Sequence, residues 1–202
     1  MIQQASVIIC AYLLGCCNTG YYLVRLRTGR DIRSMASGGT GSRNVGRALG
    51  AQGFFCTFLG DAGKGVLAVW LARQAGPTEW LAMAALLAAV AGHVFPAQLG
   101  FRGGKGFATL AGGLALLWPA LLLAGFGLSL VFLALMRRST KAGLSALCLT
   151  PAVIVIWRLR DGSGLLSADF VLYLLLVVLV LFGHRDNIRR DFFGRQPAGA
   201  TE

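Results

Sequence analysis

The residues best suited to chemistry surround a glycine-cushioned lysine near the middle of the chain. Residues 92–109 read GHVFPAQLGFRGGKGFAT and complete an apolar run. Because glycine has no Cβ, the backbone at Gly103 and Gly104 can approach an anion closely. Arg102 and Lys105 add positive charge at the same place. This combination predicts a site for a phosphate-bearing substrate.

A second basic, glycine-rich segment occupies residues 31–50. Its glycines alternate with hydroxyl side chains between residues 37 and 42, where successive backbone N–H groups could hold a phosphate. A helix is expected to begin directly afterwards, and a helix N-terminus favours an anion. A flexible linker with solvated arginines is the alternative interpretation. The candidate ligands are Ser37, Gly38, Gly41, Arg43, Asn44 and Arg47.

The third segment is HRDNIRRDFFGRQ, residues 184–196, which follows the last apolar run. Here His184 and Asn187 lie one helical turn apart and could act together. A polybasic stretch that binds anionic lipid headgroups is the simpler interpretation. Charge alone, however, does not require the histidine and the asparagine.

Three ionisable residues inside apolar runs allow both structural and functional interpretations. Asp61 and Lys64 are three residues apart in one run. They either neutralise each other or, as an ionisable pair at membrane depth, take part in function. A lone histidine such as His93 is more often a structural hydrogen-bonding residue than a catalyst.

Familiar catalytic motifs are missing from the sequence. The lysine loop departs from the P-loop pattern, because Leu99 stands where glycine is required and Gly106 follows the lysine. Nucleotide hydrolysis is therefore not expected. No Gly-x-Ser-x-Gly elbow is present, and neither histidine has an aspartate five residues later. The two histidines and scattered acids do not supply metal ligands at usable spacing, so no metal or cofactor is expected.

Composition places the chain among integral membrane proteins. Of its 202 residues, 56% are hydrophobic and 13% charged, and the mean hydropathy is +0.67. A net charge of +11 fits anionic lipid headgroups and phosphorylated substrates better than nucleic acid in so hydrophobic a chain. The five cysteines lie in or beside apolar runs and are interpreted as small buried residues.

The apolar runs predict helices that cross the membrane. One of these runs, residues 107–136, is interrupted by Trp118-Pro119 and forms either one kinked helix or two shorter ones. The other expected spans cover residues 5–24, 49–72, 78–98, 142–157 and 166–183.

The distribution of cations favours two crossings by residues 107–136. Seven spans with an outside N-terminus leave only Arg73, Arg158 and Arg160 outside, as the positive-inside rule requires. A single crossing would move the arginines after residue 184 outside. We therefore expect an all-α integral membrane protein with seven transmembrane helices, an outside N-terminus and a cytoplasmic C-terminus. Residues 1–202 form one membrane-embedded domain in this interpretation, and all three basic segments face the cytoplasm.

These segments resemble those of the bacterial membrane acyl-phosphate:glycerol-3-phosphate acyltransferases, the PlsY family. The resemblance covers nearly the whole chain and is most specific around the lysine loop. The matching residues are Tyr12–Gly15, Asp61, Lys64, Gly65, Gly92, His93, Phe95, Pro96, Phe101, Gly103–Gly106, Ala108, Thr109, His184, Arg185, Asn187, Ile188, Arg190 and Gly194.

The resemblance implies transfer of a fatty acyl group from acyl phosphate to the 1-hydroxyl of glycerol 3-phosphate. The products would be lysophosphatidic acid and phosphate, in phospholipid synthesis. It also implies a seven-helix fold in the bacterial plasma membrane with a cytoplasmic active site. The expected partners are these two substrates and membrane lipids, without nucleic acid, and the expected state is a monomer.

Site residues follow from the same resemblance. It implies that Ser37, Gly38, Asn44, Arg47 and Lys105 line the phosphate and transfer site, which His184 and Asn187 close. Catalytic roles are expected of Ser37, Lys105, His184 and Asn187. Lys64 and His93 are expected to support substrate binding.

Three positions depart from the family pattern. Gly39 stands where the family has asparagine, Arg43 where it has threonine, and Gln196 where it has glutamate. These changes add positive charge and remove a polar contact. They leave open a diverged paralogue that acylates another polar acceptor. A non-enzymatic anion transporter or lipid-binding protein is the remaining alternative, although a transporter would be expected to carry polar residues across the whole bilayer.

Overall fold

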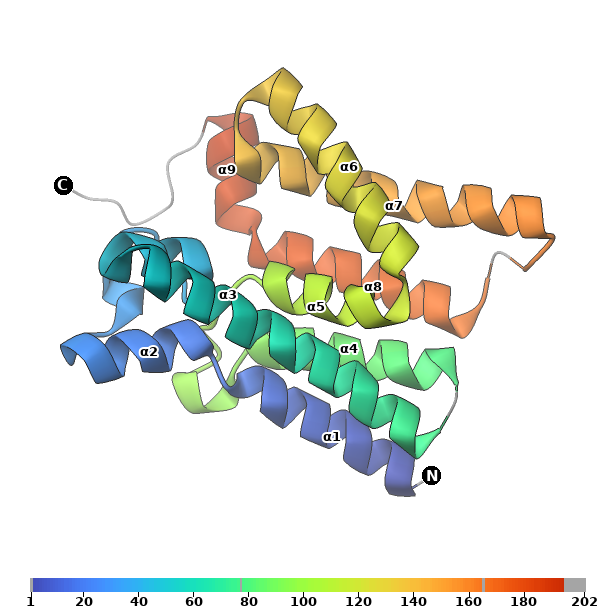
Figure 1. Cartoon of the computed structure of the whole chain (residues 1–202), viewed down its shortest axis with the longest axis horizontal. Coiled ribbons are helices and arrows are strands. Elements are labelled where there is room, and N and C mark those ends of the chain that lie inside the picture. Colours follow the sequence, from blue (N-terminus) through green and yellow to red (C-terminus); the bar gives the residue numbers. More distant parts are fainter. Residues whose placement is uncertain (1, 77, 165, 195–202) are drawn as a thin grey trace. The chain divides into compact units, whose positions relative to one another are not determined.

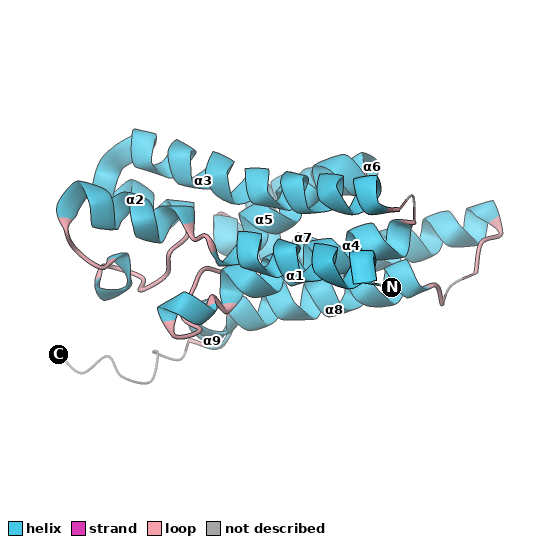
Figure 2. Cartoon of the chain, turned by 90° about the horizontal axis from the view of Figure 1, so that it is seen from below, coloured by secondary structure: helices cyan, strands magenta, loops and turns pink. Residues whose placement is uncertain are grey.

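The computed structural model describes residues 2–76, 78–164 and 166–194. Within these ranges it consists of helices joined by loops and contains no strand (Figure 2). The chain divides into two compact units, Met1–Leu117 and Trp118–Glu202. Gln196, one of the three departures from the family pattern, lies outside the described residues.

Unit 1 holds the first two basic segments and the helices that position them (Figure 1). Two 3-10 helices, η1 (Ile32–Ser34) and η2 (Ala97–Leu99), lie in its loops. Its α-helices are α1 (Ile2–Cys16), α2 (Thr19–Thr28), α3 (Ser42–Ala75), α4 (Glu79–Val94) and α5 (Phe107–Leu117).

Glycines let the helices of unit 1 pack closely. A Cβ added at Gly15 of α1 would collide with the backbone of Ala89 in α4, and one at Gly92 would collide with the backbone of α1. Gly65 and Gly112 bring α3 and α5 together in the same way. Small residues at helix contacts are typical of membrane proteins, where close van der Waals packing drives association.

Two helices of unit 1 differ from the predicted spans. The expected span 5–24 is broken between α1 and α2, where Asn18 is fully buried. The expected span 49–72 begins seven residues earlier, at Ser42, and is kinked at Gly50, whose φ of 73° is outside the helical region. The periodicity of apolar residues does not predict either break, because the residues on both sides of each break are compatible with a helix.

Unit 2 contains α6 (Pro119–Met136), α7 (Ser139–Asp161), α8 (Ala168–Gly183) and α9 (Arg185–Phe193). The predicted interruption at Trp118-Pro119 is confirmed, since Pro119 opens α6 at a position where proline is tolerated. A hydrogen bond from Tyr173 to Thr150 (2.6 Å) links α8 to α7, and the Trp118 ring packs on Tyr173.

Five helices or helix pairs in the described residues are long and apolar enough to cross a membrane, and a sixth is counted if α8 and α9 form one bent span. Seven were predicted. The difference is α5, which at 11 residues is about 16 Å long, whereas a bilayer core measures about 30 Å. The all-helical membrane fold is thus confirmed at this coarser level.

Candidate phosphate-binding site

Lys105 lies beside the glycine-rich loop of the basic segment 31–50. A Cβ added at Gly39 would be 3.8 Å from Cε of Lys105, an ordinary van der Waals distance. Residues 66 positions apart in the sequence therefore meet, and the lysine ammonium group is close to the loop that carries Ser37 and Gly38. The structure thus brings together the first two predicted segments within unit 1.

Asn44 organises this loop from the first turn of α3. Its amide nitrogen donates to the carbonyl oxygens of Ile32 (3.3 Å), Met35 (3.0 Å) and Gly39 (2.9 Å). Its Oδ1 accepts a hydrogen bond from the N–H of Ser37 (3.2 Å). The side chain is buried and has its polar atoms occupied by the loop. Asn44 was expected to bind phosphate, and the geometry indicates that it shapes the loop instead of facing a ligand.

Arg33 connects the same loop to the lysine loop. Its guanidinium group donates to the carbonyl of Leu99 (2.7 Å) and forms a forked pair with the Asp31 carboxylate (2.8–3.1 Å), over the ring of Tyr21. Hydrogen bonds from Arg33 hold the pKa of Asp31 below its usual value, and the carboxylate raises the pKa of Arg33 in return. The spacing of Asp31 and Arg33 did not reveal this contact, because Leu99 contributes only its backbone.

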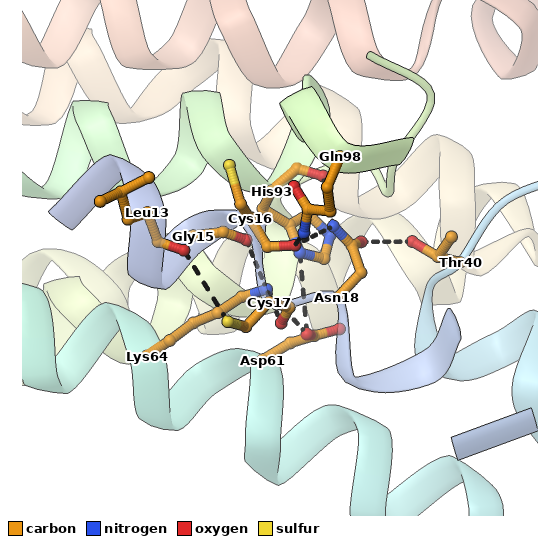
Figure 3. Close-up of polar contacts among 10 residues, drawn as sticks. All are labelled: Leu13, Gly15, Cys16, Cys17, Asn18, Thr40, Asp61, Lys64, His93 and Gln98. Atoms are coloured by element: carbon orange, nitrogen blue, oxygen red, sulfur yellow. Dashed lines mark hydrogen bonds and ion pairs between the residues drawn. The ribbon is translucent and has the colours of Figure 1, made fainter. Parts of the chain in front are cut away.

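Asn18 joins both loops at the break between α1 and α2 (Figure 3). Its Oδ1 accepts a hydrogen bond from Thr40 (2.6 Å), and its amide nitrogen donates to the carbonyls of Cys16 (3.3 Å) and His93 (3.4 Å). Gln98 donates to the same Cys16 carbonyl (2.6 Å). Sequence reasoning missed Asn18, Thr40 and Gln98 as members of this network. An asparagine inside an apolar run was the available signal, since buried polar groups require partners.

Lys64 is an internal support beneath these loops. Its Nζ donates to the carbonyls of Gly15 (3.0 Å) and Cys17 (3.1 Å) and pairs with Asp61 Oδ1 (3.1 Å) (Figure 3). The last carbonyls of a helix have no intrahelical partner and attract a cation. Lys64 therefore donates hydrogen bonds to carbonyl groups at the end of α1, and Asp61 neutralises the charge of Lys64. This geometry is compatible with a structural and with a functional role of the Asp61–Lys64 pair. Lys64, however, contacts the end of α1 and Asp61, and it does not reach the surface of the loops.

His93 supports the lysine loop from below. Its Nδ1 lies 3.7 Å from Asp61 Oδ1, too far for a hydrogen bond, and the side chain is buried. On its other side, Gly104 packs directly on the imidazole ring, so that a Cβ there would collide with Nε2. A Cβ at Gly103 would collide with the His93 carbonyl oxygen.

The two glycines therefore serve a purpose that the sequence did not reveal. Their N–H groups donate within the fold, from Gly103 to the carbonyl of Val94 (3.1 Å) and from Gly104 to that of His93 (2.9 Å). These two N–H groups therefore have their hydrogen-bond partners within the fold. Gly103 and Gly104 are needed because the loop passes so close to His93, and this packing fixes the position of Lys105.

The remaining cations of unit 1 lie on exposed surfaces. Arg43 and Arg47 line an open pocket of about 380 Å³, together with Gly46, Gly50, Ala51 and Phe54 at the kink of α3. Arg102 is exposed in the lysine loop, and Gly41 precedes the first residue of α3, as predicted for a loop that leads into a helix N-terminus.

In unit 2, His184 and Asn187 occupy the first turn of α9. His184 is the N-cap residue, and its Nδ1 lies 2.9 Å from the carbonyl oxygen of Val180. The helical backbone thus places the two residues one turn apart. No group of three or more potential metal ligands occurs among the residues that the structure describes.

The fold and these loops define a class: a polytopic helical membrane protein that presents cations and glycine-rich loops suited to an anionic substrate. Residues 5–194 match the family described as glycerol-3-phosphate acyltransferase. The chain belongs to this family.

Similar proteins and solved structures also support membership of this family. The chain is 42% identical over 185 residues to glycerol-3-phosphate acyltransferase 1 of Desulfitobacterium hafniense, covering 91% of this chain and 88% of the relative. It is 41% identical to the enzyme of Parasynechococcus marenigrum, covering 92% and 85%. It also resembles crystal structures of PlsY, an integral membrane glycerol 3-phosphate acyltransferase. The glycerol 3-phosphate form has a TM-score of 0.84 at 29% identity, covering 96% of this chain and 94% of PlsY. For the lysophosphatidic acid form the TM-score is 0.79.

Proposed function

We propose that this protein transfers a fatty acyl group to the 1-hydroxyl of glycerol 3-phosphate and so produces lysophosphatidic acid. Family membership supports the acceptor and the reaction, and PlsY structures exist in glycerol 3-phosphate and lysophosphatidic acid forms. The observation that carries the proposal for this chain is the meeting of Lys105 with the loop at Gly39. It places a flexible cation beside polar loop atoms, where a phosphate can be held.

Acyl phosphate is the proposed donor. It is already activated, so the protein needs no covalent nucleophile, and the glycerol hydroxyl oxygen attacks the acyl carbonyl carbon directly. The bond from that carbon to the phosphate oxygen breaks, inorganic phosphate leaves, and the hydroxyl proton passes to a substrate phosphate. The protein then has to align the two substrates and stabilise the developing oxyanion.

Each predicted residue has a role in this reaction that its position supports. Lys105 holds substrate phosphate, and Ser37, exposed on the adjacent loop, contacts the reacting groups. Arg43 and Arg47 attract phosphate at the open pocket of α3. Arg102 is proposed to steer anionic substrates towards the loop, because its charge is exposed.

His184 and Asn187 are proposed to complete the catalytic set from α9. We propose that Gly38 and Gly41 give the loop of residues 37–42 the shape it needs, since Gly38 has a φ of 67°. Lys64, His93, Gly103, Gly104 and Asn44 are proposed to act on substrate through the positions of these loops.

Seven crossings, an outside N-terminus and a cytoplasmic site in the bacterial plasma membrane belong to the same proposal, with one domain and a monomeric state. Counting the short helix α5 as a crossing keeps the basic segments on one face, as the positive-inside rule favours. Single cysteines introduced at Arg138 and Arg160 of a cysteine-free variant test this topology. A membrane-impermeant maleimide added to spheroplasts should label position 160 and spare position 138, and the reverse pattern would contradict it.

Acyl transfer is tested with purified protein, labelled glycerol 3-phosphate and two donors, palmitoyl phosphate and palmitoyl coenzyme A. Lysophosphatidic acid should form with palmitoyl phosphate alone. Product from palmitoyl coenzyme A only would refute the donor and retain the acceptor. If a close relative is active alongside and this folded protein gives no product with either donor, the acyltransferase proposal is wrong.

A further inference from the structure

Helix α9 leaves the preceding helix at a steep angle. The chain bends by 68° between α8, an apolar helix, and α9. Figure 1 shows α9 turning away from the α8 axis beside the start of α7. Since transmembrane helices tilt by about 20° on average, a helix at this angle to a span lies closer to the membrane plane than to its normal.

The exposed face of α9 combines arginines with an aromatic ring. Phe193 is 70% exposed. Arg189 and Arg190 precede it by four and three residues, so they lie on neighbouring parts of the same helix surface, and both are exposed. Phe192 is 44% exposed and lies beneath the ammonium group of Lys141 (5.2 Å to the ring centre). One aromatic side chain thus attaches α9 to α7, and the next one points outward.

The contact with Lys141 also joins α9 to the junction between α6 and α7. Two exposed arginines occupy that junction. Among the described residues, six cations and two carboxylates, Asp186 and Asp191, therefore gather at one end of unit 2. Asp191 pairs with Arg190 (2.9 Å). We call these six cations the basic collar. Its members are Arg137, Arg138, Lys141, Arg185, Arg189 and Arg190.

We propose that the basic collar and Phe193 form a binding surface for anionic phospholipids of the bilayer. The arginines hold lipid phosphate groups, and Phe193 enters the boundary between headgroups and acyl chains. Several observations favour a lipid surface over a free phosphate. The cations lie at the junction of α6 with α7 and on α9, and they are mostly exposed. The exposed aromatic side chain of Phe193 ends α9, the short basic helix that follows the apolar helix α8. This inference goes beyond the proposed acyl transfer.

Native mass spectrometry measures this binding directly. Purified protein in detergent is given an equimolar mixture of phosphatidylglycerol and phosphatidylcholine with identical acyl chains. Wild type should retain phosphatidylglycerol in excess. Each arginine near an anionic surface contributes about fivefold to affinity, so the variant Arg137→Gln/Arg138→Gln/Arg189→Gln should lower the retained ratio by at least about tenfold.

The matched control is Arg27→Gln/Arg73→Gln/Arg160→Gln, which makes the same change of net charge at exposed arginines outside the collar. Its lipid ratio should stay within about twofold of wild type. An equal fall in both variants would reduce the effect to net charge and overturn the site. An unchanged ratio in the folded collar variant would overturn it as well. A higher KM for glycerol 3-phosphate with an unchanged lipid ratio would assign the arginines to substrate.

A second measurement does not depend on the stability of that variant. Benzoylphenylalanine at position 193 of the otherwise unchanged chain, reconstituted in phosphatidylglycerol vesicles, should form photo-crosslinks to phospholipid. Crosslinks to a second copy of the chain would instead identify this surface as a protein interface and contradict the proposal.

Discussion

An alanine at position 104 would place its methyl group against the imidazole of His93. Three ring atoms, Nε2, Cε1 and Cδ2, lie less than 3.0 Å from the position of the added Cβ. His93 is only 3% exposed, so the ring has no solvent to move into. Overpacking of this kind costs about 1–3 kcal/mol. Either the ring or the lysine loop has to shift, and the loop carries Lys105.

For a chain of this length, that cost lowers Tm by about 2–12 °C. Turnover should suffer more than stability, because a displacement of about 1 Å at a reacting group can reduce the rate about 100-fold. Thermal unfolding in detergent and kcat/KM for glycerol 3-phosphate measure the two effects. An unaltered Tm and an unaltered kcat/KM in the Gly104→Ala variant would contradict the packing described above.

Removing the ring supplies the decisive comparison. In a His93→Ala background the added methyl group meets free space, so Gly104→Ala should lower Tm much less than it does with His93 present. Gly103→Ala is the matched control, since its Cβ would collide with the His93 carbonyl oxygen and the Pro96 ring, which His93→Ala leaves in place. Equal rescue of both alanines, or rescue of neither, would refute a specific contact between Gly104 and the imidazole.

Three further outcomes are expected. Lys64→Met should destabilise the protein by about 3–5 kcal/mol because it leaves Asp61 buried and unpaired, and Asp61→Asn in the same chain should recover part of the loss of Tm. The pKa of Asp31 is lowered in the folded state by Arg33, so the stabilisation is present above the unfolded pKa of about 3.9 and is lost as the pH falls through the folded value. Asp31→Asn should therefore flatten the dependence of Tm on pH below about pH 4, by an amount under about 1 kcal/mol because the pair is partly exposed; an unchanged slope would contradict the linkage. Gly39→Asn should fold normally and change kcat/KM for glycerol 3-phosphate by less than about threefold, whereas a large increase would favour a different natural acceptor.

The helical membrane fold could be predicted from the sequence because long apolar runs have few alternatives in a bilayer. The break at Pro119 was predictable for the same kind of reason, since proline cannot continue a helix interior. The break at Asn18 and the kink at Gly50 were not, because they depend on tertiary partners. Asn18 is stabilised by Thr40 and by the carbonyl of His93, which are distant in the sequence.

The candidate site, like the fold, could be predicted from the sequence only in part. Glycines and cations identified the two loops, and the structure brings Lys105 to Gly39. The sequence did not predict which property of glycine the lysine loop requires. Gly103 and Gly104 were expected to let the backbone approach an anion. In the structure, glycine is the only residue type small enough to pass His93 at these two positions. The contact from Arg33 to Leu99 was equally hidden, because a carbonyl acceptor leaves no signature in residue types.

The most direct test of the phosphate site is the kinetic effect of Lys105→Met with palmitoyl phosphate and glycerol 3-phosphate. The side chain is half-buried in a loop, so its charge can be removed while most of its apolar stem is retained. We predict that kcat/KM falls by at least about 100-fold, the scale of a lost charge-assisted contact to substrate, while Tm stays within about 3 °C of wild type. Wild-type kcat/KM in the folded variant would contradict a phosphate site at Lys105.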